Sequence, residues 1–207
     1  PARRRKKMKE PDCNPDCTPF DEFVSEVAQG LGASQGDDQA TRVVESALPK
    51  LLEDGGWLHP GHRTPHDEHY ARNLIFRHPE LGFVVVAMVW QPGQGTPVHD
   101  HGGVWCVEGV LEGSVRITQY DPVGDPKSGE GVRLRESGLF QSQIGDTGRL
   151  VPPFEYHKIE NVGDRTAITI HVYGKDLVDC RVFEDRGDGT FAARSVQLQY
   201  TPAAARN

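Results

Sequence analysis

From Ala71 onward the sequence alternates between short apolar runs, rich in β-branched and aromatic residues, and turns that contain glycine, proline, aspartate or asparagine. Such runs predict β-strands, and many short strands with closely spaced turns are typical of a sandwich or barrel. We expect strands at residues 71–76, 82–90, 104–110, 113–120, 132–134, 138–141, 147–151, 157–161, 166–173 and 179–184. This pattern favours a mainly β fold of the jelly-roll type, in which two sheets close on one another.

Two helical patterns precede the β-rich part. Residues 19–31 and 39–52 carry apolar side chains at helical spacing, and Gly55 and Gly56 end the second pattern. Residues 1–18 are charged and proline-rich, and we interpret this segment, with its basic cluster at residues 3–7, as a solvated tail with little order. We therefore expect one domain at residues 19–207, with an N-terminal helical segment at 19–55.

The composition limits the class of partner. The 207 residues include 23 basic and 30 acidic side chains, and a net charge of -7 argues against nucleic acid as the main partner. No run approaches the ~20 apolar residues of a membrane span, and no apolar segment follows the basic cluster as in a secretory signal. We expect a cytoplasmic monomer. The four cysteines are too few and scattered for a disulfide framework, and Cys13 and Cys17 are treated as incidental.

Residues 93–113 contain the sequence His99-Asp100-His101. In a strand, alternate side chains share a face, so both imidazoles would project into the same space. Neutral imidazole is the commonest metal ligand, although a surface His-x-His pair without a metal is the better interpretation of the pair alone. A third ligand should come from another strand, and His157 is the best candidate. We expect no metal role for the loop histidines His59, His62, His66, His69 and His78.

Two stretches resemble the two motifs of the cupin superfamily. They read Gly93-x5-His99-x-His101-x4-Cys106-x6-Gly113 and Gly145-x6-Pro152-x4-His157-x3-Asn161. Two positions depart from the usual pattern, because Cys106 stands where most cupins have a glutamate and Phe154 where the second motif usually has a glycine. The resemblance implies a cupin-type β-barrel (jelly roll) with N-terminal helices.

Cysteine in place of that glutamate, with three histidines left as ligands, is similar to the thiol dioxygenases and specifically to cysteine dioxygenase. The segment from Tyr70 to Leu74 resembles the one whose arginine binds the substrate carboxylate. The segment from Thr169 to Tyr173 resembles the family's Ser-His-Tyr triad, with threonine in place of serine. Cys180 also falls where the family has a cysteine, so the resemblance runs from about Tyr70 to Phe183.

The resemblance implies an iron(II)-dependent enzyme that oxidises L-cysteine to cysteine sulfinate with dioxygen. The implied roles are metal binding by His99, His101 and His157, substrate binding by Arg72 and Tyr70, and catalysis by Tyr173, His171, Thr169 and Cys106. It also implies a thioether bond between Cys106 and Tyr173. Because Thr169, His171 and Tyr173 would share one face of a strand, we expect a relay in which Thr169 positions His171 and His171 positions the phenol of Tyr173.

Two alternatives stay open. Relatives that oxidise 3-mercaptopropionate or another small thiol carboxylate typically lack the cysteine at position 106 and carry their arginine downstream of the tyrosine. Here Arg181 lies downstream, and Gly174 and Lys175 replace the usual Ser-Pro. The other alternative is a cupin that binds a small ligand without catalysis, or one that uses zinc or manganese.

Overall fold

The computed structural model describes residues 18–124, 132–153 and 155–202. The prediction of little order for residues 1–18 lies outside this range apart from Thr18, which begins the first helix, and Cys13, Cys17 and Phe154 also lie outside it. In the described part of the chain, no helix has the length and apolar character needed to cross a membrane.

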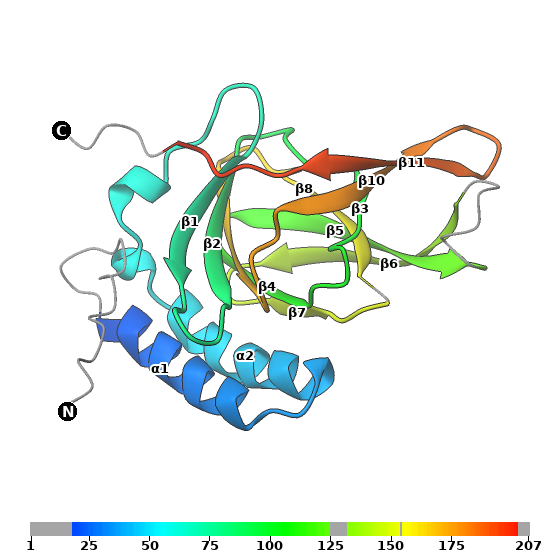
Figure 1. Cartoon of the computed structure of the whole chain (residues 1–207). Helices are drawn as coiled ribbons and strands as arrows, with labels where there is room; N and C mark the ends of the chain where they lie inside the picture. Colours follow the sequence, from blue (N-terminus) through cyan, green and yellow to red (C-terminus); the bar gives the residue numbers. More distant parts are fainter. Residues whose placement is uncertain (1–17, 125–131, 154, 203–207) are drawn as a thin grey trace.

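Two helices lie side by side against one face of the β-structure (Figure 1). Helix α1 spans Thr18–Ala33 and helix α2 spans Asp37–Leu52, and two short 3-10 turns, η1 (Gly55–Trp57) and η2 (Pro60–His62), follow them. Their apolar faces are buried because hydrophobic side chains recur at helical spacing. The prediction of N-terminal helices is confirmed.

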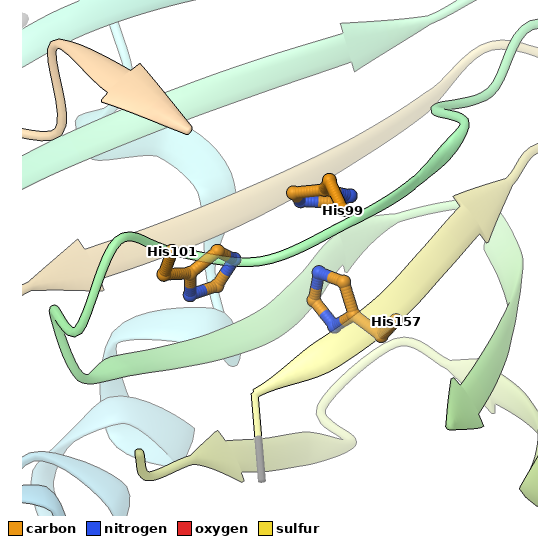
Figure 2. A group of neighbouring side chains, drawn as sticks. All are labelled: His99, His101 and His157. Atoms are coloured by element: carbon orange, nitrogen blue, oxygen red, sulfur yellow. The ribbon is translucent and has the colours of Figure 1, made fainter. Parts of the chain in front are cut away.

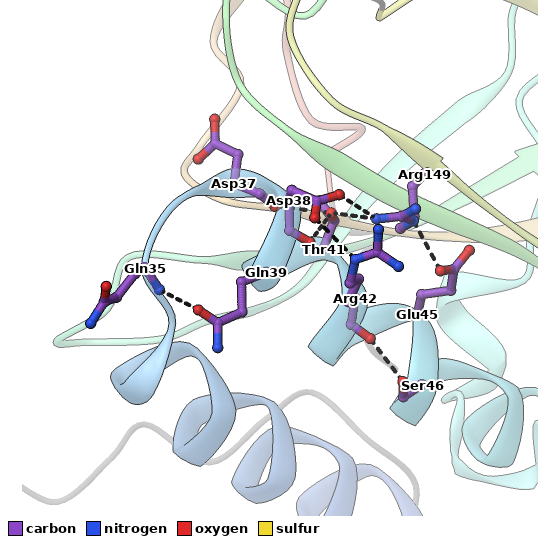
Figure 3. Close-up of polar contacts among 9 residues, drawn as sticks. All are labelled: Gln35, Asp37, Asp38, Gln39, Thr41, Arg42, Glu45, Ser46 and Arg149. Atoms are coloured by element: carbon purple, nitrogen blue, oxygen red, sulfur yellow. Dashed lines mark hydrogen bonds and ion pairs between the residues drawn. The ribbon is translucent and has the colours of Figure 1, made fainter.

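Salt bridges attach the polar side of α2 to a β-strand (Figure 3). Arg149, on strand β7 (Thr147–Leu150), lies 3.1 Å from the carboxylate of Asp38 and 2.9 Å from that of Glu45. Its side chain is about one quarter exposed, so these pairs are partly screened by water and contribute little to stability. They connect α2 to the edge strand of the first sheet, while the apolar face of α2 makes the buried contacts.

The strands form two antiparallel sheets. The first sheet has the order β1-β2-β9-β4-β7, and its strands are β1 (Ala71–Arg77), β2 (Val84–Trp90), β9 (Ala167–Tyr173), β4 (Cys106–Glu112) and β7 (Thr147–Leu150). The second has the order β11-β10-β3-β8-β5-β6, and its strands are β11 (Phe191–Gln197), β10 (Asp179–Asp185), β3 (Val98–His99), β8 (Tyr156–Glu160), β5 (Ser114–Val123) and β6 (Arg133–Gln143). The mainly β jelly roll expected from the sequence is confirmed, with two facing sheets rather than one closed barrel.

Strands β2 and β9 are buried along their whole length because the first sheet is covered on both faces. On β2, Val85, Ala87 and Val89 pack with the helices, whereas Val86 and Met88 pack between the sheets. The same alternation on β9 turns Ile168, Ile170 and Val172 toward the helices. Their neighbours Thr169, His171 and Tyr173 are therefore left for the interior between the sheets.

Three strand predictions differ from the structure. The two strands predicted at residues 132–134 and 138–141 are parts of one strand, β6 (Arg133–Gln143), which begins one residue later and continues past a register shift opposite Gln119 and Tyr120. Strand β11 was not predicted, because it mixes alanine, arginine, serine and glutamine, and it is an edge strand that pairs along its length with β10. Strand β3 is only two residues long and ends at His99, so His101 is not on a strand.

Candidate metal centre and adjoining cavity

Three histidines converge between the sheets (Figure 2). One ring nitrogen of each of His99, His101 and His157 lies within 4.8 Å of one nitrogen of each of the others. His99 and His157 are direct partners in the pairing of β3 with β8, which fixes the spacing between their rings. The centroids of the three rings are 4.6–5.3 Å apart. The arrangement can therefore hold one metal ion.

His101 reaches this centre through a turn rather than through strand alternation, which corrects the geometry expected from the sequence. The buried carboxylate of Asp100 accepts hydrogen bonds from the backbone N–H of Gly102 (3.2 Å) and of Arg181 (2.8 Å). The turn continues through Gly102 and Gly103, whose φ angles of 57° and 77° are in the left-handed region. Asp100 thus fixes the loop that carries His101, a role that the sequence analysis missed.

The electrostatics of the three rings suit a cation. Burial is the main cause that lowers the pKa of each ring, and neighbouring histidines lower the pKa values of His101 and His157 further. All three rings are therefore neutral at pH 7, with lone pairs to donate. In the described part of the chain, both ring nitrogens of His101 are buried without a hydrogen-bond partner. These orphaned nitrogens fit a divalent metal that accepts nitrogen ligands.

A second cluster lies on the facing strands β4 and β9. Ligand atoms of Cys106, Glu108 and His171 lie within 4.8 Å of one another, and all three residues are buried. In the strand pairing Glu108 is opposite His171 and Cys106 is opposite Tyr173. The sequence analysis missed Glu108, although alternation along β4 places it on the same face as Cys106.

The structure contains the first contact of the expected relay, the one between Thr169 and His171. Thr169 Oγ1 lies 2.8 Å from His171 Nε2 and accepts a hydrogen bond of 2.9 Å from Trp90 Nε1. The described residues show no hydrogen bond between His171 and Tyr173, whose rings lie nearly parallel with centroids 6.0 Å apart. The other nitrogen of His171, Nδ1, instead faces Cys106 Sγ at 4.0 Å and Glu108 Oε2 at 3.3 Å.

Tyr173 is adjacent to Cys106 and interacts with its thiol. Burial is the largest cause that raises the pKa of the Tyr173 phenol, and it also raises the pKa of the Cys106 thiol well above its usual range. Both groups are therefore protonated at neutral pH. The phenol can donate a hydrogen bond toward the cavity described next.

A cavity of about 230 Å³ adjoins the three-histidine centre on the side of His99 and His157. Its lining includes His99, His157 and Tyr173. The two residues predicted to bind substrate, Arg72 and Tyr70, also line it. The remaining lining is largely apolar and includes Met88, Trp90, Ile159, Leu177, Val182, Val196 and Leu198. The cavity therefore combines a metal-ligating wall with one buried cation.

The Arg72 guanidinium is held at the end of this cavity. Its Nη2 donates to the carbonyl oxygen of Leu177 (3.0 Å), and its Cζ lies 4.4 Å from the ring centroid of Tyr200. Arg72 is only 4% exposed, and within the described part of the chain no carboxylate lies at ion-pair distance from it. A buried cation without a counter-ion is costly, so this group favours an anionic ligand.

Arg181 lies on the opposite face of β10 from the cavity. Its Nε donates to Asp100 Oδ2 (2.7 Å), and its Nη2 lies 3.3 Å from the hydroxyl of Tyr156. Its neighbours Cys180 and Val182 line the cavity instead, and burial raises the pKa of the Cys180 thiol to about 11. A second arginine at the cavity is Arg194 on β11, which pairs with Glu184 at 2.9 Å and which the sequence analysis missed.

Two facing sheets with a buried three-histidine centre and an adjoining cavity define a cupin with a candidate metal site. The family model for cysteine dioxygenase type I matches residues 64–186, which is more than half of the chain, and the chain belongs to this family. Arg72 and the other predicted site residues fall inside the matched range.

Individual relatives agree with this assignment. The chain is 30% identical over 121 residues to cysteine dioxygenase type 1 of Rattus norvegicus, covering 56% of each protein. It is 29% identical over 121 residues to that of Homo sapiens, again covering 56% of each. The chain thus spans about half the length of the curated relatives it matches.

Solved structures similar to the chain include two small proteins. TT1209 from Thermus thermophilus has a TM-score of 0.39 and 20% identity, covering 53% of this chain and 87% of the other. The cupin domain of Cnp3 from Schizosaccharomyces pombe has a TM-score of 0.39 and 15% identity, covering 51% and 60%.

Proposed function

We propose that this protein is an iron(II)-dependent thiol dioxygenase that oxidises L-cysteine to cysteine sulfinate. The reaction adds both atoms of dioxygen to the thiol sulfur, RSH + O2 → RSO2H. The observation that carries the proposal is that two of the three clustered histidines, His99 and His157, line the same cavity as the buried Arg72. The family match and the names of the relatives support the same reaction.

His99, His101 and His157 would hold the metal. Bound iron(II) would offer positions for a thiol and for dioxygen beside these three ligands. The apolar lining excludes bulk water from the remaining space, which strengthens electrostatic interactions inside the cavity.

Arg72 binds and orients the substrate carboxylate. A guanidinium presents parallel N–H donors that match a carboxylate, and burial makes this charge-assisted pairing stronger than it would be in water. Tyr70, stacked on Trp90 at 4.5 Å between centroids, forms the wall beside it. Substrate binding therefore supplies the counter-ion that the described residues do not provide for Arg72.

Tyr173 holds a proton at its phenol oxygen, because burial raises its pKa well above the ordinary value. We assign it the role of hydrogen-bond donor to the reacting thiol or oxygen. A thioether between Cys106 and Tyr173 is part of the same proposal. Its formation joins the sulfur to a ring carbon and removes in total two protons and two electrons, which dioxygen accepts to give hydrogen peroxide.

A second candidate substrate is 3-mercaptopropionate. The lining of the cavity includes no carboxylate, so the described residues offer no ion pair to the ammonium group of cysteine. Both thiols carry the carboxylate that Arg72 would bind, and they differ only in the amine. The position of Arg181, outside the cavity and paired with Asp100, supports Arg72 as the carboxylate-binding residue for either substrate.

The test is dioxygen uptake and sulfinate formation by iron-loaded protein with cysteine, 3-mercaptopropionate and a thiol without a carboxylate. We expect turnover of the first, weaker turnover of the second and none of the third. If iron-loaded protein turns over none of these thiols, the assignment as a thiol dioxygenase is rejected. A higher kcat/KM for 3-mercaptopropionate would replace cysteine as the substrate.

Replacing Arg72 by alanine tests substrate binding. Because a hydrogen-bonded ion pair contributes about 1.5–3 kcal/mol, kcat/KM for the carboxylate thiols should fall by roughly 10- to 150-fold in R72A. The matched control is R77A, on the same strand, because the half-exposed Arg77 pairs with Asp176 outside the cavity. Equal effects in the two variants would contradict the role given to Arg72.

A further inference from the structure

Glu108 is a buried carboxyl group that the proposed reaction does not use. It is 4% exposed, and its Oε2 accepts no hydrogen bond of good geometry from the described residues. It lies on β4 between Val107 and Gly109, with its side chain on the inward face that also carries Cys106 and Val110. An acid here costs desolvation energy that an aliphatic residue would not, so its presence calls for a function.

The position of Glu108 connects two groups of site residues. Its Oε1 lies 3.9 Å from Nδ1 of His157, and its Oε2 lies 3.3 Å from Nδ1 of His171. Nδ1 of His157 otherwise has no hydrogen-bond partner, which leaves Nε2 of that ring for the ion. His171 has Thr169 at its other nitrogen. One carboxyl group therefore faces both the second nitrogen of a candidate metal ligand and the ring at the centre of the predicted relay.

We propose that Glu108 is a positioning residue that orients His157 as a metal ligand and ties it to the Thr169–His171 pair. The identity of the ion as iron(II) rests on the proposed function, but the role of Glu108 applies to any metal that the three histidines hold. Histidine ligands commonly donate their second N–H to a carboxylate, which fixes the orientation of the ring and makes it a better ligand. Closing the 3.9 Å separation on metal binding would form this contact.

The experiment compares E108L and E108Q with the matched control E112Q. Glu112 is on the same strand but half exposed and paired with Arg63, so E112Q removes a carboxylate without touching the histidines. Iron(II) affinity is measured by competition with a chelator, without substrate. We expect E108L to weaken iron binding by about 10- to 100-fold, E108Q to weaken it less because an amide keeps one contact, and E112Q to leave it unchanged.

Two further readouts separate positioning from a general structural role. The metal-free E108L protein should melt at the same temperature as the wild type or higher, because leucine fits an apolar site without desolvation cost. The visible spectrum of the cobalt(II)-substituted variant should change, because the orientation of one ligand changes. A lower melting temperature together with unchanged iron affinity would overturn the proposal.

Metal stoichiometry provides another test. One ion per chain is expected in the wild type. Two ions in the wild type and one in E108L would make Glu108 a ligand of a second ion with Cys106 and His171, which would also overturn the positioning role. These measurements need no thiol, so their failure is distinct from failure of the thiol panel with wild-type protein.

Discussion

The two buried clusters of this protein are similar in size and different in chemistry. His99, His101 and His157 come from β3, the following turn and β8, whereas Cys106, Glu108 and His171 come from β4 and β9 of the other sheet. The first cluster contains three neutral rings, and among the described residues both nitrogens of its central ring, His101, have no hydrogen-bond partner. The second contains groups that face one another, with Thr169 and Trp90 continuing its hydrogen bonds. The difference indicates that the first cluster is suited to bind an ion and the second to place hydrogen bonds beside it.

Replacing one histidine from each cluster should give the largest difference in iron binding between variants. H157A removes a ligand, so we expect iron binding to fall below detection in metal analysis. H171A should keep iron affinity within about 10-fold, because His171 is not one of the three clustered ligands and contacts His157 through Glu108. Its turnover should nevertheless be lost.

The exposed His69 offers a control, and H69A should retain both iron and activity. Loss of iron from H171A to the same degree as from H157A would mean that the two clusters form a single metal site.

The ionisation of Glu108 should be visible in the way the free energy of unfolding changes with pH. Burial raises its pKa from 4.5 to about 8, so the folded state binds an extra proton between these values and loses stability as the pH rises across them. The buried histidines act in the opposite direction: burial lowers the pKa of His171 from 6.5 to about 3, so stability is lost as the pH falls below about 6.5.

The buried histidines are present in both the wild type and E108L. Their contribution to the pH dependence therefore cancels when the unfolding free energies of the two proteins are subtracted. Between pH 5 and pH 8 metal-free E108L should therefore gain stability relative to the wild type, by on the order of a few kcal/mol. Thermal melts at several pH values measure this difference. Parallel curves for the two proteins would mean that Glu108 does not titrate differently on folding.

Replacing Thr169 by valine should have the smallest effect. T169V keeps the shape of the side chain but leaves the buried Trp90 Nε1 without its acceptor, so we expect a loss of about 1–3 kcal/mol in unfolding free energy. Iron affinity should be unchanged, and kcat should fall because His171 loses its partner. Thr118, also buried but in the second sheet, provides the control variant T118V. A weaker affinity for iron in T169V would contradict the division between the clusters.

The sequence predicted the jelly roll well because its strands are short and separated by turn residues. The continuous apolar run of β2 follows from burial on both faces of the first sheet. Strand β11 could not be predicted in the same way, because an edge strand needs few apolar residues.

The candidate site was predicted in part. Strand alternation correctly brings His171 and Tyr173 to one face, but His101 reaches the centre through the turn that Asp100 fixes. That turn depends on a contact with Arg181, far along the chain, which no local pattern indicates. Glu108 was missed because an acid in a strand ordinarily predicts an outward-facing position, and only the pairing with β9 shows it beside His171.

Because β3 is so short, an ion at the candidate metal centre would affect how firmly the strands of the second sheet are held together. With only two residues, β3 is the join between β10 on one side and β8 on the other, and His99 is paired with a residue on each. An ion bound by both His99 and His157 would cross-link β8 to the two-residue strand β3. Occupancy of the centre would then determine how readily the β10–β11 hairpin, which carries Cys180, Val182 and Arg194 of the cavity wall, separates from the rest of the sandwich.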